Sequence, residues 1–205
     1  MRRIPLSRRS HVTGFGSFEA GVVVEHESAL ERDFALLASF DDPDAAIVSQ
    51  PMTIRFATDD SPRRYTPDFG VKWSDGRYEL VEVKYRADLR LNWPSLRPGV
   101  AAARDAAREV NGRFRIVTES AIRCPRLDNA RRLLPLRKAP LDAGLAETAR
   151  TLVMRLGAPT LRETVTAMPC DRVVALGAVW RLMARGDLVF DPRLAVGFDT
   201  RLRVS

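Results

Sequence analysis

One short stretch constrains this chain more than any other, because it has the sequence of a β-hairpin with charged residues at its open end. Two runs with strand character flank a Ser-Asp-Gly turn at residues 74–76. A three-residue loop whose glycine is left-handed is a low-cost way to join two antiparallel strands. That loop sets the register: Phe69 pairs with Val81, and Asp68 lies opposite Glu82.

Side chains alternate along a strand, so the predicted hairpin has two different faces. The second face carries Asp68, Glu82 and Lys84. Two carboxylates opposite each other repel, so a purely structural hairpin gains nothing from them. A divalent cation between them removes the repulsion and places Lys84 beside the ion. The pattern predicts a metal-dependent phosphodiesterase site, and a solvated hairpin face is the alternative. The opposite face of the hairpin is apolar and is expected in the core; its residues are Phe69, Val71, Trp73, Val81 and Val83.

Composition indicates a soluble globular protein with one large domain or two small ones. The chain has 205 residues, of which 45% are hydrophobic and 29% charged. It has no apolar run long enough to cross a bilayer, and we expect no secretory signal because the basic start leads into no apolar stretch. Cys124 and Cys170 lie far apart, which favours a cytoplasmic protein with reduced thiols. With His11 and His26 as the only histidines, a histidine-rich zinc site is excluded.

Positive charge is concentrated after the hairpin. The net charge is +7, and residues 86–138 hold thirteen arginines and lysines against five acids. Such a cluster beside a phosphodiesterase site is what contacts to a polyanionic backbone require. The DNA-binding candidates are Arg86, Arg90, Arg104 and Arg108.

The first two thirds of the chain predict an α/β fold, a mixed sheet flanked by helices. We expect a basic arm over 1–25, a nuclease domain over 26–125 and a linker over 126–140. The elements expected in the nuclease domain are a helix over 28–40, strands over 46–50 and 52–57, a polar turn over 58–62, the hairpin, an irregular arm up to residue 99, a helix over 100–110 and a strand over 114–118.

The last third, 141–205, predicts a small winged-helix-like domain that binds either DNA or a protein partner. Its expected elements are helices over 141–156, 160–167 and 171–185, then strands over 188–191 and 196–204. The third helix is expected to turn inward Val174, Leu176, Val179, Trp180 and Met183.

Two further candidates each have a second interpretation. Glu31 opens the first helix and could complete the site, but Ser28-x-x-Glu31 is also a capping box. Gln50 could line the site or end a strand before Pro51.

Four motifs in order resemble the TnsA endonucleases of heteromeric cut-and-paste transposons. They are residues 27–33 (Glu-Ser-Ala-Leu-Glu-Arg-Asp), 49–51 (Ser-Gln-Pro), 65–69 (Tyr-Thr-Pro-Asp-Phe) and 81–84 (Val-Glu-Val-Lys). The resemblance implies a restriction-endonuclease-like PD-(D/E)xK domain followed by the winged-helix-like tail. It carries over Glu31, Asp68 and Lys84 as catalytic residues, while at position 82 family members place either Glu or Gln.

The resemblance also implies a mechanism and a setting. Asp68 and Glu82, with the Val83 carbonyl, would hold Mg²⁺, for which Mn²⁺ substitutes, and Glu31 would complete the site or bridge to a second ion. The protein would cut the non-transferred 5′ strand at transposon ends in double-stranded DNA. Its partners would be an integrase-type transposase and an AAA+ ATPase regulator, in the bacterial cytoplasm at the nucleoid. The alternatives are a stand-alone restriction or repair nuclease and a non-catalytic DNA-binding adaptor with a vestigial nuclease fold.

Overall fold

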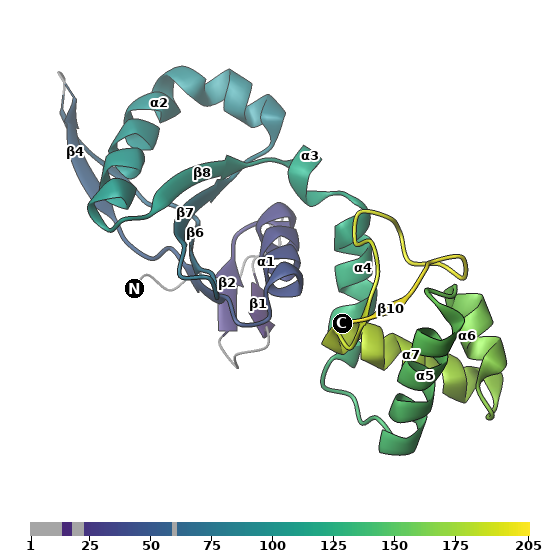
Figure 1. Cartoon of the computed structure of the whole chain (residues 1–205). Helices are drawn as coiled ribbons and strands as arrows, with labels where there is room; N and C mark the ends of the chain where they lie inside the picture. Colours follow the sequence, from purple (N-terminus) through teal and green to yellow (C-terminus); the bar gives the residue numbers. More distant parts are fainter. Residues whose placement is uncertain (1–13, 18–22, 59–60) are drawn as a thin grey trace. The chain divides into compact units, whose positions relative to one another are not determined.

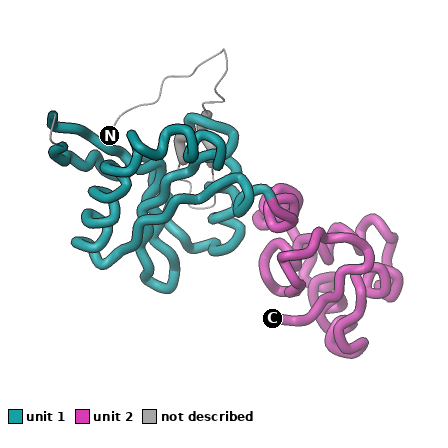
Figure 2. Tube along the Cα trace, turned by 90° about the horizontal axis from the view of Figure 1, so that it is seen from above, with its two compact units in different colours: residues 1–123 teal, residues 124–205 magenta. Residues whose placement is uncertain are grey.

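The computed structural model describes residues 14–17, 23–58 and 61–205. The chain divides into two compact units, residues 1–123 and 124–205 (Figure 2). Among the described helices, none combines the length and the apolar composition needed to cross a membrane.

The first unit is built on a four-stranded mixed sheet in the order β3-β6-β7-β8 (Figure 1). Strand β6 runs antiparallel to both β3 and β7, whereas β8 is parallel to β7. The predicted α/β fold with a mixed sheet is therefore confirmed. The elements of this unit are β1 (Gly14–Ser17), β2 (Val23–His26), α1 (Ala29–Asp41), β3 (Ala46–Ser49), β4 (Ile54–Thr58), β5 (Ser61–Tyr65), β6 (Phe69–Lys72), β7 (Tyr78–Val83), α2 (Arg86–Glu109), β8 (Arg113–Val117) and α3 (Glu119–Ile122).

Both faces of the sheet are covered. On one face Phe69 of β6 packs against Phe34 of α1, with 5.4 Å between the ring centroids. On the other face Leu80 of β7 is buried in a cluster with Ile54 of β4 and Ala103 of α2. The second face thus lies under α2 and the β4–β5 hairpin.

One prediction for this unit is wrong. The helix expected to begin near residue 100 begins at Arg86 and contains Pro94 and Pro98. Each proline removes a backbone hydrogen bond and crowds the preceding turn, so the helix bends instead of ending (Figure 1). Of the turn expected over 58–62, Thr58 ends β4, Ser61 and Pro62 begin β5, and residues 59–60 lie outside the described residues.

The predicted basic arm falls mostly outside the described residues, which omit 1–13 and 18–22. Between these gaps, β1 and β2 form an antiparallel pair that the sequence did not predict.

The second unit is mainly helical and ends in a small hairpin. The capping signals are confirmed: Thr160 and Glu163 form a capping box, Asp171 caps α7, and Gly157 and Gly186 end helices in the left-handed region. The winged-helix assignment stays a prediction. The elements are α4 (Pro125–Leu133), a 3₁₀ turn η1 (Leu134–Leu136), α5 (Ala143–Leu156), α6 (Leu161–Ala167), α7 (Arg172–Arg185), β9 (Leu188–Val189) and β10 (Arg203–Val204).

Three details of the second unit differ from expectation. The segment expected as a linker contains α4, because Leu127, Ala130 and Leu133 give it a buried face. The last two strands are shorter than expected, since the loop between them is bonded to the buried Asn129 of α4, which donates to the carbonyl of Leu194 at 2.8 Å and to that of Pro192 at 3.1 Å. Helix α7 buries a neighbouring face, Ala175, Ala178, Val179, Leu182, Met183 and Ala184, and leaves Val174 exposed.

Candidate active site

The hairpin has the predicted register. Phe69 pairs with Val81, and the backbone N–H of Trp73 donates to the carbonyl of Arg77 at 2.9 Å across the turn. Gly76 has φ +87°, the left-handed conformation expected of it. This turn therefore places Asp68 and the end of β7 at the same open end of the hairpin.

The side chain of Asp68 reaches across to β7, where its Oδ2 accepts the backbone N–H of Val83 at 2.7 Å. Glu82 is only 4% exposed. Its Oε1 accepts the ammonium of Lys84 at 2.9 Å, and its Oε2 accepts the hydroxyl of Tyr65 at 2.7 Å. The structure thus brings the two carboxylates and the lysine to one end of the sheet, on its α2 face.

The cluster carries more negative than positive charge, because the carboxylates of Asp68, Glu82 and Glu31 act on the single ammonium of Lys84. Burial, together with the nearby carboxylates of Glu82 and Glu31, raises the pKa of Asp68 well above its ordinary value. Burial disfavours the Lys84 ammonium, but the charges of the same carboxylates outweigh it and raise the pKa of Lys84. Lys84 therefore stays protonated, so it can stabilise negative charge but is a poor base.

Glu31 shows the capping arrangement. The backbone N–H of Glu27 donates to its Oε2 at 2.7 Å, and the Ser28 hydroxyl donates to its Oε1 at 2.9 Å. The N–H of Glu31 in turn donates to the Ser28 hydroxyl at 3.1 Å. Its charge nevertheless acts on both Asp68 and Lys84, so the carboxylate lies at the border of the site. Its role as a metal ligand stays a prediction.

Gln50 contacts the site through its backbone. Its N–H donates to the carbonyl of Asp68 at 2.8 Å, while its side-chain amide donates to Glu27 at 3.0 Å. Gln50 also has φ +45°, a conformation that residues other than glycine rarely adopt. The residue thus connects Asp68 with the start of α1.

Tyr65 is the functional candidate that the sequence did not single out. Besides its bond to Glu82, its ring packs so closely on Gly99 of α2 that a Cβ there would lie 2.6 Å from the ring. Burial and the charges of Glu82 and Asp68 raise the pKa of Tyr65, which keeps its hydroxyl a donor. In the sequence, the contact between Tyr65 and Gly99 is indicated by the presence of a glycine within the helical segment and by the Tyr-Thr-Pro-Asp motif that contains Tyr65.

The four arginines predicted to bind DNA, Arg86, Arg90, Arg104 and Arg108, all lie on α2. Of these, Arg108 forms an ion pair with Asp105 at 2.9 Å. DNA binding by these side chains stays a prediction.

The donors at the hairpin suit a hard divalent cation. Within the described parts of the chain, no group of three or more histidine, cysteine or acidic side chains is arranged to hold a metal. Mg²⁺ does not require one, since it is commonly held by one or two carboxylates and completes its shell with water. Asp68 and Glu82 provide two carboxylates, and burial together with the neighbouring carboxylates raises the pKa of Asp68.

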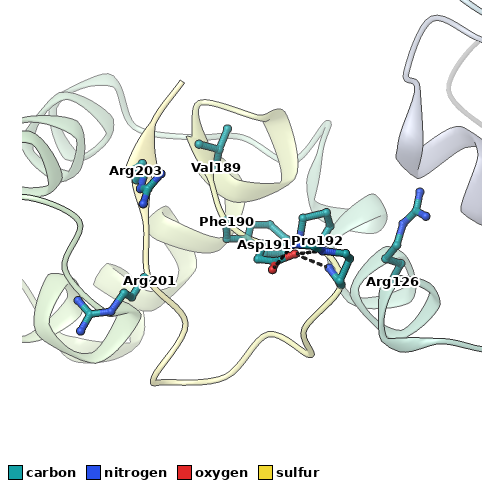
Figure 3. Close-up of a pocket in the computed structure, with 8 residues that line it drawn as sticks. Arg126, Val189, Phe190, Asp191, Pro192, Arg201 and Arg203 are labelled. Atoms are coloured by element: carbon teal, nitrogen blue, oxygen red, sulfur yellow. Dashed lines mark hydrogen bonds and ion pairs between the residues drawn. The ribbon is translucent and has the colours of Figure 1, made fainter.

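A cavity of about 690 Å³ in the second unit has the opposite character (Figure 3). Arg126, Arg201 and Arg203 line it, and its one acid, Asp191, is bonded to Arg193 at 3.0 Å. With one carboxylate, already bonded to Arg193, this cavity does not offer the pair of carboxylates that the hairpin provides.

The fold and this cluster together describe a mixed α/β domain that carries two acids and a lysine at the end of its central hairpin. Residues 45–119, a little over a third of the chain, match the family model of the TnsA-like endonuclease N-terminal domain. This segment, which contains Asp68, Glu82 and Lys84, is therefore similar to the N-terminal domain of TnsA-like endonucleases. No curated protein matches the chain.

Proposed function

We propose that this protein is a Mg²⁺-dependent DNA endonuclease that cuts the non-transferred 5′ strand at transposon ends. The observation that carries the proposal is the Asp68–Glu82–Lys84 cluster within the segment that matches the endonuclease family. Two buried carboxylates that repel each other beside a single lysine destabilise the fold, and a bound cation would offset this repulsion.

Each residue of the cluster has a specific part. Asp68, Glu82 and the Val83 carbonyl would hold the ion, and Mn²⁺ would substitute for it. The bound ion supplies an activated water and stabilises the leaving oxygen. Lys84 stays protonated and stabilises the negative charge that develops on the phosphate. Glu31 borders the site and would complete the donor set once its capping bonds open.

The rest of the chain would serve binding and assembly. Exposed arginines of α2, including Arg86 and Arg90, would contact the DNA backbone. The second unit, whose order of helices and hairpin resembles a winged helix, would dock an AAA+ ATPase regulator. An integrase-type transposase would cut and join the other strand. These partners follow from the family and from no contact seen in the structure.

The test is strand cleavage by the full chain reconstituted with its transposase, DNA ends and Mg²⁺. Asp68→Ala should abolish 5′-strand cleavage while cleavage by the transposase persists. The matched control is Glu79→Gln, another buried acid of the same strand, which should cleave like the wild type. Wild-type cleavage by Asp68→Ala would refute the enzyme and favour a DNA-binding adaptor.

A further inference from the structure

The β4–β5 hairpin carries arginines that the fold does not explain. Arg55 of β4 pairs directly with Arg64 of β5, and both side chains are exposed. Like charges directly opposite each other on an antiparallel pair destabilise it. Among the described residues, neither guanidinium has a hydrogen bond or an ion pair with a carboxylate. This pair costs stability, so a function outside the fold must explain it.

The same hairpin is anchored on its other face. Ile54 and Tyr65, which pair with each other one step further along, belong to the cluster with Leu80 and α2. Because alternation turns Arg55 and Arg64 away from this cluster, they form an outward basic ribbon, whereas Arg63 pairs with Phe56 on the other face.

The ribbon is also fixed relative to the candidate site. Tyr65, the last residue of β5, donates to Glu82 at 2.7 Å, and Asp68 follows three residues later. A group held by the ribbon is therefore held at a set place relative to the carboxylates.

We propose that this ribbon, Arg55 and Arg64, binds backbone phosphates of duplex DNA next to the cleaved bond. The inference rests on the proposed function, which makes a phosphodiester backbone the ligand of the neighbouring site. An antiparallel two-stranded ribbon has the dimensions to follow a groove of B-DNA, and guanidinium groups match phosphate geometry. The ribbon would supply phosphate contacts in addition to those expected from α2.

The test measures binding of the full chain to a labelled DNA duplex by fluorescence anisotropy in EDTA, over a series of salt concentrations. The ribbon variant is Arg55→Ala with Arg64→Ala. The matched control, Arg155→Ala with Arg162→Ala, removes the same charge from two exposed arginines outside the basic segment 86–138. Removing one phosphate-binding arginine should lower the slope of log K against log salt by about 0.9, so the ribbon variant should lose about 1.8 and bind at least about tenfold more weakly. The control should keep the wild-type slope.

A second variant separates binding from folding. Arg64→Glu places an acid opposite Arg55, so the ribbon gains a cross-strand ion pair and the melting temperature should stay or rise. DNA affinity should nevertheless fall about as far as in the double alanine variant, because both changes lower the charge of the ribbon by two units. Equal affinity of ribbon and control variants, or wild-type binding by Arg64→Glu, would overturn the inference. Because no cleavage is measured, a protein that binds through the ribbon but cuts nothing would refute only the nuclease proposal.

Discussion

Glu79 and Glu82 are two buried glutamates of β7. Each accepts hydrogen bonds from the same kinds of group, but the charge around the two differs. Glu79 accepts the indole N–H of Trp73 at 3.1 Å and the guanidinium of Arg115 at 3.0 Å. Glu82 accepts the hydroxyl of Tyr65 and the ammonium of Lys84. Each acid thus has one aromatic donor and one cation, on opposite faces of the sheet.

The difference lies in the surrounding charge. Glu79 is balanced by Arg115, whose side chain is half exposed and well hydrated. Glu82 shares Lys84 with two more carboxylates, Asp68 and Glu31, whose charges act on it as well. A buried acid with its own cation is a structural ion pair. Three acids whose charges act on one lysine leave an excess of negative charge, which we propose a bound cation offsets.

The largest expected effect separates the two cations. Lys84→Ala should lower 5′-strand cleavage in the reconstituted system by about 10²–10³-fold, or about 3–4 kcal/mol, which is typical when one preorganised electrostatic interaction is removed. Arg115→Ala should leave cleavage unchanged, because Arg115 pairs on the other face. Equal losses in the two variants would contradict the distinction.

The free energy of unfolding should depend more strongly on the Glu79 pair than cleavage does. Glu79→Ala leaves the indole N–H of Trp73 without its acceptor and removes the ion pair to Arg115, so urea unfolding should show a loss of about 2 kcal/mol. Conservative Glu79→Gln should recover most of this loss. If Glu79→Ala instead abolishes cleavage without loss of stability, Glu79 is not structural.

The aromatic donors give a smaller effect. Tyr65→Phe keeps the packing on Gly99 but removes the hydrogen bond that orients Glu82. We expect the Mg²⁺ concentration for half-maximal cleavage to rise about tenfold, with the rate at saturating Mg²⁺ nearly unchanged. A loss of maximal rate at every Mg²⁺ concentration would place Tyr65 in the chemistry itself.

The smallest effect concerns pH. The pKa of Asp68 in the folded chain lies above its unfolded value of about 3.8, so the folded state holds the proton more tightly. In EDTA, the wild type should therefore gain stability relative to Asp68→Asn as the pH falls from 8 through the folded pKa. Above that pKa, Asp68→Asn should be the more stable of the two. If urea unfolding shows that the free energies of unfolding of the wild type and Asp68→Asn change with pH in parallel, folding does not raise the pKa of Asp68.

Local signals in the sequence predict much of this architecture. The Ser-Asp-Gly turn and the alternation of Phe69 and Val71 give the hairpin register, and Asp171 and Gly186 mark the ends of α7. The cluster of Asp68, Glu82 and Lys84 follows from that register.

Other features depend on contacts that no local pattern encodes. The prolines at 94 and 98 indicate a break, but packing on the sheet holds α2 together across them. Strand β5 has almost no apolar residues and forms because Tyr65 pairs with Ile54 and packs on Gly99. The bond from Tyr65 to Glu82 depends on both of these outcomes, so it could be recognised only in the structure.

The central claim is that the Asp68–Glu82 end of the hairpin holds a divalent cation. Its most direct test is the anomalous diffraction of Mn²⁺ in crystals of the wild-type protein. The account predicts one peak between the carboxylates of Asp68 and Glu82, within ligand distance of the Val83 carbonyl, and none beside Glu79. Crystals soaked in Mn²⁺ that show no peak at Asp68 and Glu82 would contradict it.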